Sequence, residues 1–323
     1  MQKVKKVFSR FGFAQLAGMS AIMLLSLAAA PFVNTESLEK LVSGVGPSVV
    51  LLLTYVPNIL YLLVFWLIIR KVPKAQWRKE PMSLATLLKI FVMMYALSTV
   101  LNQIGTVISR AAPAGGTQQL DLIDSVVNTR LLIGFLIPAV IGPVVEELIF
   151  RKLMIDRLHN YGETAVIVFT ALCFGLFHGN LTQFLYASCV GLFLGYVYCK
   201  TGKVIYTMMM HILLNTMSAS IMLLLPILQG GIGNGRVFLL VAVGVLAVVV
   251  LTMGVSGFIL IVRTLKKKDI VLDDSMAESI PNNEVLKTVY LNPGVMLLFA
   301  FGTAFIVMDL LKLQLPFPGS SVE

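Results

Sequence analysis

The chain has 323 residues, of which 58% are hydrophobic and 13% are charged, and its mean hydropathy is +0.90. This composition excludes a set of soluble domains, a disordered chain and a disulfide-stapled secreted scaffold, because each of these needs more polar residues or more cysteine. In so apolar a chain, the formal net charge of +9 is typical of basic loops that set membrane orientation and face anionic lipid, so we expect a bilayer and no nucleic acid as partner.

Nine apolar stretches approach the roughly 20 residues that a helix needs to cross a hydrocarbon core about 30 Å thick. In chain order they are residues 11–32, 45–69, 84–108, 131–150 running on to 158, 164–178, 181–199, 204–225, 237–262 and 295–311. The fifth is short, and a re-entrant fifth helix would change the parity of every later one. The predicted fold is an all-α, polytopic membrane helical bundle of about eight to nine transmembrane helices.

Basic residues are retained on the cytoplasmic side of membrane helices. With nine spans and a cytoplasmic amino terminus, the outer segments of the chain contain only Lys40, Arg110, Arg130, Arg236 and Lys312. The other 20 of the 25 Lys and Arg residues fall on the inner side. This asymmetry predicts that the amino terminus is cytoplasmic.

The ends of the chain and its polar stretches define the expected organisation. The first helix resembles a signal peptide, with a basic start and Ala28-Ala29-Ala30, but its apolar run is longer than a signal h-region, which favours a retained helix. Residues 109–130 and 269–288 are predicted loops, the second separating a lone last helix from the rest. The expected units are three N-terminal spans (1–130), a helical core (131–225), an eighth helix (226–268), a polar cytosolic loop (269–290), and a final helix and tail (291–323).

Ionisable side chains inside a membrane span are costly and therefore mark candidate functional positions. The fourth span contains Glu146, Glu147 and Arg151, the fifth ends at His178, and the seventh carries His211 together with the polar Asn215. Two of the three histidines of the chain are thus predicted to be intramembrane.

Helix geometry predicts how these residues are paired. Glu147 and Arg151 are four residues apart and can form an ion pair, whereas Glu146 points about 100° away and is expected to be free. His211 and Asn215 share the same spacing and should project from one face. Phe174 lies one turn before His178 and is expected to pack beside it.

The register of the chain predicts that Glu146 and His178 face each other. Their midpoint is Gly162, in a turn-like polar stretch, so an antiparallel hairpin turning there places both at the same height. His211 is harder to place, because its distance from the turn at 200–203 indicates a shallower depth, which only a tilted or broken sixth helix would reconcile.

Purely structural interpretations stand beside these. The Glu147–Arg151 pair could be a structural ion pair near the cytoplasmic boundary, and His211 with Asn215 could be interhelical hydrogen-bonding groups. His159 is predicted to be a turn residue, and Cys173, Cys189 and Cys199 to be buried free thiols. A free acid, two imidazoles and a carboxamide on three helices nevertheless exceed what packing requires.

Three motifs resemble those of the CAAX prenyl protease and bacteriocin-processing (CPBP, or Abi) family of intramembrane endopeptidases. The family pattern Glu-Glu-x-x-x-Arg is present at 146–151, Phe-x-x-x-His at 174–178, and His-x-x-x-Asn at 211–215. Each motif is short, but all three in this order on consecutive membrane helices are specific. The resemblance covers residues 130–225 and leaves the other helices without a recognised motif.

The resemblance implies hydrolysis of a peptide bond in a membrane-embedded or lipid-associated protein or peptide. Glu146 and His178 would activate a water and His211 and Asn215 would stabilise the oxyanion, supported by Glu147, Arg151 and Phe174. No cofactor is expected, with a zinc site at Glu146, His178 and His211 as the alternative. The alternatives to an enzyme are a non-catalytic scaffold or immunity protein and a transporter that uses the same polar groups. The expected location is a membrane, the plasma membrane of a bacterium.

Overall fold

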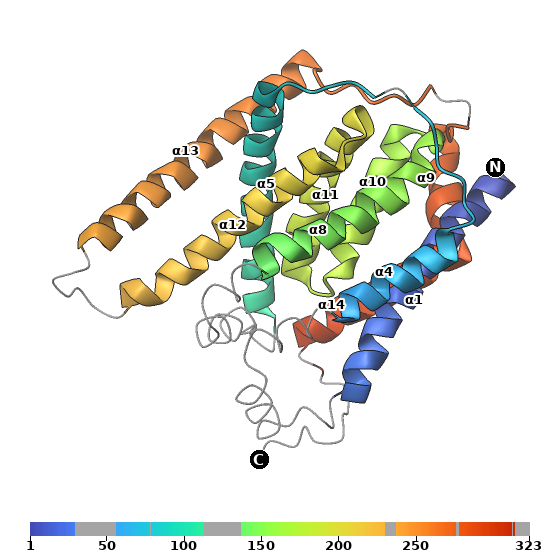
Figure 1. The fold of residues 1–323 in the computed structure, drawn as a ribbon, viewed down its shortest axis with the longest axis horizontal. Coiled ribbons are helices and arrows are strands. Elements are labelled where there is room, and N and C mark those ends of the chain that lie inside the picture. The colour runs from blue at the N-terminus through green and yellow to red at the C-terminus, as the bar shows by residue number, and fades with distance from the viewer. Residues whose placement is uncertain are drawn as a thin grey trace.

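The protein is a helical bundle, seen here in a computed structural model that describes residues 1–29, 56–77, 79–112, 137–229, 237–275, 278–311 and 313 (Figure 1). Every regular element in these ranges is helical, as the composition predicted: α1 (Gln2–Ala29), α4 (Val56–Ile69), α5 (Leu84–Ala111), η2 (Ile137–Ile141), α8 (Gly142–Glu147), η3 (Leu148–Ile155), α9 (Asp156–Leu158), η4 (His159–Tyr161), α10 (Glu163–Phe177), α11 (Leu181–Thr201), α12 (Val204–Gln229), α13 (Val237–Lys267), η5 (Asn282–Glu284), η6 (Leu286–Tyr290) and α14 (Pro293–Leu311).

Membrane character is visible in the lengths and surfaces of these helices. Within the described ranges, five helices are long and apolar enough to cross a bilayer, and α4 and α10 are shorter apolar helices. In the span within α13, only 6% of the residues are buried inside the protein, and many of its exposed side chains are aliphatic, among them Val245, Leu251 and Val255. Such a surface is suited to lipid rather than water. The total of eight to nine spans stays a prediction.

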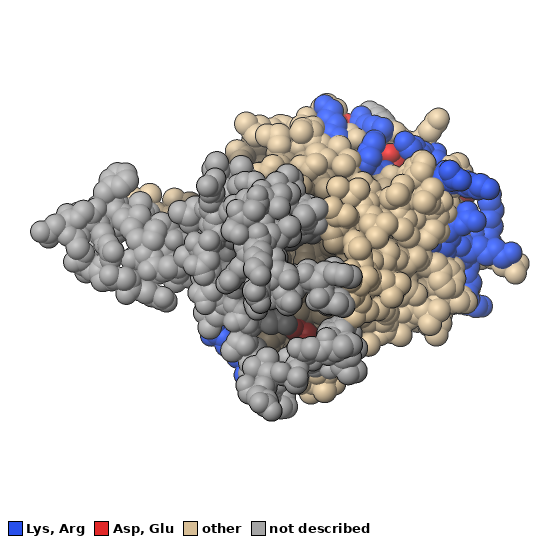
Figure 2. All heavy atoms as spheres, turned by 60° about the horizontal axis from the view of Figure 1, so that its bottom comes forward, with Lys and Arg blue, Asp and Glu red and all other residues tan. Residues whose placement is uncertain are grey.

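Part of the predicted organisation lies outside the described residues. This applies to the beginnings of the spans at 45–69 and 131–150, to most of the loop at 109–130, and to Lys40, Arg78, Arg130, Arg236 and Lys312. Figure 2 shows that Lys and Arg side chains gather toward one end of the molecule, next to a broad surface of other residues. That this end faces the cytoplasm is a prediction.

The centre of the bundle is the close contact between α10 and α11. A Cβ at Gly191 would lie 2.8 Å from the Cα of Ala171, and a Cβ at Gly175 would overlap the side chain of Ser188. Glycine at these positions therefore lets the two backbones approach. The contact holds the end of α10 beside the first turns of α11.

The last helix is not a lone element, and that prediction was wrong. Helix α14 packs along α1, where Gly12 faces the backbone of Gly294, and the N–H of Gly294 donates to the Ser9 hydroxyl at 3.0 Å. Helix α1 is in turn part of the core, because Phe8 and Phe11 are fully buried. These contacts join residues almost 300 positions apart, which periodicity within one helix does not reveal.

The predicted hairpin turn at Gly162 is confirmed. Gly162 has φ of +101°, a conformation that only glycine adopts without strain, and α10 begins at the next residue. His159 lies in this turn, as predicted, and is buried with its ring stacked on Trp77 at a centroid distance of 4.1 Å. The three cysteines are buried and free, also as predicted.

The polar loop at 269–288 is exposed over most of its described residues, as predicted, and it is also docked on α10. Two residues, Asp273 and Asp274, form a clasp on the first turn of α10. The Asp274 carboxylate accepts from the backbone N–H of Thr164 at 2.9 Å and from its hydroxyl at 2.6 Å, while Glu163 accepts from the N–H of Asp273 at 2.8 Å. Gly162 has no side chain to cap the helix, so the free N–H groups of α10 are satisfied from a distant part of the chain.

The short turn from Asp273 to Ser275, next to the clasp, is sensitive to acid. Hydrogen bonds from the hydroxyl and the backbone N–H of Ser275 lower the pKa of Asp273 below its ordinary value. A carboxylate with a lowered folded-state pKa stabilises the fold above its unfolded-state pKa, and this contribution is lost as the pH falls through the folded-state pKa. The hydrogen bonds between Asp273 and Ser275 are therefore expected to be intact at neutral pH and to be lost in the acid range.

Replacing Asp274 with Ala is expected to lower the free energy of unfolding by about 0.5–2 kcal/mol, the usual effect of removing a helix cap. The change should appear in detergent-solubilised protein as a lower midpoint of thermal unfolding and as faster amide exchange at 163–166. Asp269→Asn is the control, since Asp269 makes an exposed ion pair with Lys89 at 3.4 Å, and such pairs contribute less than about 1 kcal/mol. Equal stability of the two variants would contradict a capping role for Asp274.

Candidate active site

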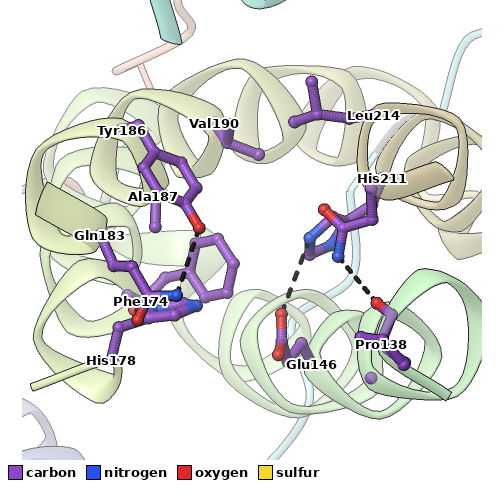
Figure 3. A pocket seen from close by; sticks show the side chains of 12 residues that line it. Pro138, Glu146, Phe174, His178, Gln183, Tyr186, Ala187, Val190, His211 and Leu214 are labelled. Carbon is purple, nitrogen blue, oxygen red and sulfur yellow. Dashed lines mark hydrogen bonds and ion pairs between the residues drawn. The ribbon is translucent and has the colours of Figure 1, made fainter. Parts of the chain in front are cut away.

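The candidate site is a cavity of about 200 Å³ whose lining includes Glu146, His178, His211 and Asn215 (Figure 3). These four residues come from α8, the turn after α10, and α12. The structure therefore brings together all four side chains that the sequence predicted to be catalytic. The supporting residue Phe174 also lines this cavity.

The segment that carries the two glutamates is one helix with altered winding. Ile141, Leu148 and Asp156, at the junctions of its pieces, all have right-handed helical dihedral angles, and the flanking pieces η2 and η3 are π-helical. Wider turns of this kind occur frequently at functional sites. The altered winding places Glu146 and Glu147 on the short α-helical piece between two π-helical turns.

The predicted ion pair between Glu147 and Arg151 is confirmed. Their Oε2 and Nε atoms are 3.0 Å apart, and both side chains are almost completely buried. The guanidinium of Arg151 also lies over the ring of Phe174 at 5.1 Å. Because both charges are removed from solvent, the pair is an integral part of the core rather than an exposed contact at the membrane boundary.

His211 contacts both glutamates, so the expectation that Glu146 is free was wrong. Its Nδ1 lies 3.0 Å from Glu147 Oε1 and its Nε2 lies 3.7 Å from Glu146 Oε2. The depth of His211, which the sequence left open, follows from the path of α12 directly beside α8 and η2. Helix α11, the sixth predicted span, is unbroken from Leu181 to Thr201. Helix α12, which carries His211, is inclined to α5 in Figure 1.

His178 is held by its own helix and by an aromatic ring. Its Nδ1 lies 2.9 Å from the carbonyl oxygen of Phe174, and the two rings are 5.1 Å apart in an edge-on arrangement, which confirms the predicted packing. A carbonyl oxygen only accepts hydrogen bonds, so Nδ1 carries the proton. The neutral ring therefore has its basic lone pair on Nε2.

Asn215 is fixed by a contact that spacing along one helix does not reveal. Its Nδ2 donates to the carbonyl oxygen of Pro138 at 3.1 Å. In the π-helical register that carbonyl would accept from residue 143, but Pro143 has no N–H. Asn215 supplies the missing donor, and its second N–H remains available on the cavity side.

Two polar residues of the cavity were not recognised in the sequence. Gln183 and Tyr186 lie on one face of α11 and line the cavity. They are uncharged and belong to none of the three motifs, so neither burial cost nor resemblance identified them. Gln183 follows Asn180 by three residues, and Tyr186 follows Gln183 by three residues. This spacing was the available signal, because it places both side chains on one face of α11, directly after the turn that carries His178.

Within the described part of the chain, no three His, Cys, Asp or Glu side chains are grouped closely enough to hold a metal ion. Each imidazole has its Nδ1 committed, to the Phe174 carbonyl and to Glu147. These contacts leave Nε2 of each ring as the nitrogen that could meet a ligand, so the zinc alternative at Glu146, His178 and His211 stays a prediction.

Comparisons with known proteins agree with the motifs. Residues 128–217 match the family model described as type II CAAX prenyl endopeptidase Rce1-like. This match agrees with the resemblance over the segment, and the apolar helices together with the similarity support an integral membrane protein.

A curated relative extends the similarity beyond that segment. The chain is 27% identical to a Bacillus subtilis (strain 168) protein named "Putative membrane peptidase YdiL". The match covers 48% of this chain and 65% of that protein, somewhat less than two thirds of its length. No solved structure matches the chain.

Proposed function

We propose that the protein is an intramembrane endopeptidase that hydrolyses a peptide bond of a membrane-associated protein or peptide. The observation that carries the proposal is that a carboxylate, two imidazoles and a carboxamide, contributed by three separate segments, line one cavity of the Rce1-like domain. Such a set provides both a base for water and donors for an oxyanion.

In the proposed reaction, Glu146 and His178 activate the water. Glu146 takes a proton from the water while the oxygen of the water attacks the carbonyl carbon of the peptide. The basic Nε2 of His178 orients the water and assists the proton transfer. The proton then passes to the leaving amine as the C–N bond breaks. A positioned acid–base group of this kind accelerates a reaction by about 10²–10⁴-fold.

The oxyanion is proposed to form between His211 and Asn215. The second N–H of the Asn215 amide donates to it, since the first is held by Pro138. His211 donates from Nε2 when its ring is an imidazolium, and the carboxylates of Glu146 and Glu147, 3.7 Å and 3.0 Å away, balance that charge. Glu147 thus has a positioning role for His211, and Arg151 holds Glu147 in place.

Replacing Asn215 with Ala is expected to lower kcat by about 10²–10³-fold, the usual effect of removing one oxyanion donor. KM should change little, because the donor acts on charge that develops only in the transition state. Steady-state kinetics in nanodiscs measures both quantities. A rise in KM at unchanged kcat would contradict the oxyanion role and would indicate that Asn215 only binds substrate.

The function is tested with purified protein in nanodiscs and a mixed panel of single-span peptides, including a prenylated peptide with a CAAX end, because the matching family is described by that substrate. Mass spectrometry of the products identifies any cleaved bond. We expect cleavage by wild type that is lost in His178→Ala and is indifferent to a chelator. Loss on chelation with recovery on zinc would indicate a metalloprotease. Absence of cleavage of every peptide by folded protein would favour a scaffold or a transporter.

A further inference from the structure

The first turns of α11 form a wall of the cavity that the proposed chemistry does not yet use. Gln183 and Tyr186 both line the cavity, and Figure 3 shows the Tyr186 hydroxyl pointing into it. The side-chain amide of Gln183 donates to this hydroxyl oxygen at 3.4 Å. A polar group is therefore oriented toward the place where a substrate would lie.

The direction of that hydrogen bond follows from a backbone group. The N–H of Gln183 can only donate, so the atom of Asn180 that faces it at 2.9 Å is the carbonyl oxygen Oδ1. The side-chain amino group of Asn180 then faces the side-chain oxygen Oε1 of Gln183, 2.5 Å away. It also donates to the backbone carbonyl oxygen of His178. The amino end of Gln183 is consequently the end that faces Tyr186.

This chain of contacts leaves the Tyr186 proton free. A phenol oxygen that accepts a hydrogen bond from Gln183 still has its own O–H to donate. Among the residues that the structure describes, no acceptor is within hydrogen-bonding distance of that proton. With respect to the described residues, the hydroxyl is thus a directed donor into the cavity whose proton has no internal acceptor, as in a substrate-binding group.

We propose that Tyr186 binds the substrate by donating a hydrogen bond to a backbone carbonyl oxygen of the peptide, and that Gln183 positions it for this role. Figure 3 places Tyr186 and His178 on one side of the cavity and His211 on the other. The substrate carbonyl that Tyr186 binds therefore belongs to a neighbouring peptide unit. It is not the reacting carbonyl, whose oxygen faces His211 and Asn215. This inference rests on the proposed peptidase function.

A donor to a non-reacting carbonyl binds the ground state and the transition state alike, so its loss raises KM and leaves kcat nearly unchanged. For Tyr186→Phe we expect a rise in KM of about 5- to 50-fold, since a buried carbonyl of the substrate then loses its hydrogen-bond donor. Tyr196→Phe, on the same helix but outside the cavity lining, is the matched control and should resemble wild type. An unchanged KM, or a loss confined to kcat, would overturn the proposal.

Gln183→Glu tests the orientation of the phenol with almost no change in shape. A carboxylate has no N–H, so it would accept the Tyr186 proton and turn the hydroxyl away from the substrate. The variant is expected to reproduce the rise in KM, and Gln183→Glu combined with Tyr186→Phe should be no worse than either alone. Additive effects in the double variant would show that Gln183 acts independently of Tyr186.

Failure of this inference is distinguishable from failure of the proposed function. Turnover by wild type with normal KM in Tyr186→Phe overturns only the role of Tyr186. If wild type cleaves no peptide, binding of the same peptides is measured by titration on Glu146→Gln and on Glu146→Gln combined with Tyr186→Phe. Weaker binding to the double variant supports the hydrogen bond, whereas equal affinities, or no binding to either, overturn it.

Discussion

Glu146→Gln is expected to abolish peptide-bond hydrolysis, with a loss of at least about 10³-fold, while the fold is preserved. Glutamine has nearly the same shape and can still contact Nε2 of His211, but it cannot accept the proton of the attacking water, which removes general-base catalysis. The measurement is product formation from a cleaved peptide, together with the midpoint of thermal unfolding for the same preparation.

The control for this variant is Glu278→Gln, which neutralises an exposed carboxylate in the linker before α14. It should retain wild-type turnover. Continued cleavage by well-folded Glu146→Gln would falsify Glu146 as the base, and would direct attention to His178 as the group that takes the proton.

Arg151→Met is expected to destabilise the protein by about 3–5 kcal/mol, because it leaves the buried carboxylate of Glu147 without its partner. Both side chains are at most 2% exposed and 3.0 Å apart, so water cannot replace the lost contact. Denaturant titration in detergent micelles measures the change in the free energy of unfolding. Since Glu147 also holds His211, activity should fall with stability.

The neighbouring Lys152 offers a matched control. It forms an ion pair with Asp156 at 3.2 Å, also four residues apart, but its side chain is 40% exposed. Lys152→Met is therefore expected to cost less than about 1 kcal/mol. Adding Glu147→Gln to Arg151→Met should recover part of the lost stability, because it removes the unpaired charge. Equal destabilisation by the two single variants would contradict the importance of burial.

Several features of this molecule were predictable because they depend on neighbours along one chain. Helices follow from the length of apolar runs, and the Glu147–Arg151 pair follows from the four-residue repeat. The turn at Gly162 and the placement of Glu146 and His178 in one cavity follow from the fixed rise of two helices that leave the same hairpin. The packing of Phe174 against His178 has the same origin.

Other features depended on how helices distant in sequence pack against one another. The depth of His211 could not be fixed from the sequence, because the path of α12 beside α8 is set by packing and not by its distance from the preceding turn. The partner of Glu146, the attachment of Asn215 to Pro138 and the capping of α10 by Asp274 each involve residues more than 60 positions apart.

The sequence by itself therefore determined that the protein is a membrane helical bundle and which residues are candidates for chemistry. Burial cost makes ionisable side chains in apolar runs conspicuous, and helical periodicity constrains their local neighbours. Only the tertiary structure decided that His211 lies between two carboxylates and that Tyr186 points a free O–H into the same cavity. Hydrogen bonds between helices depend on the relative position and tilt of their axes, which arise from packing over the whole bundle and have no local signature in the chain.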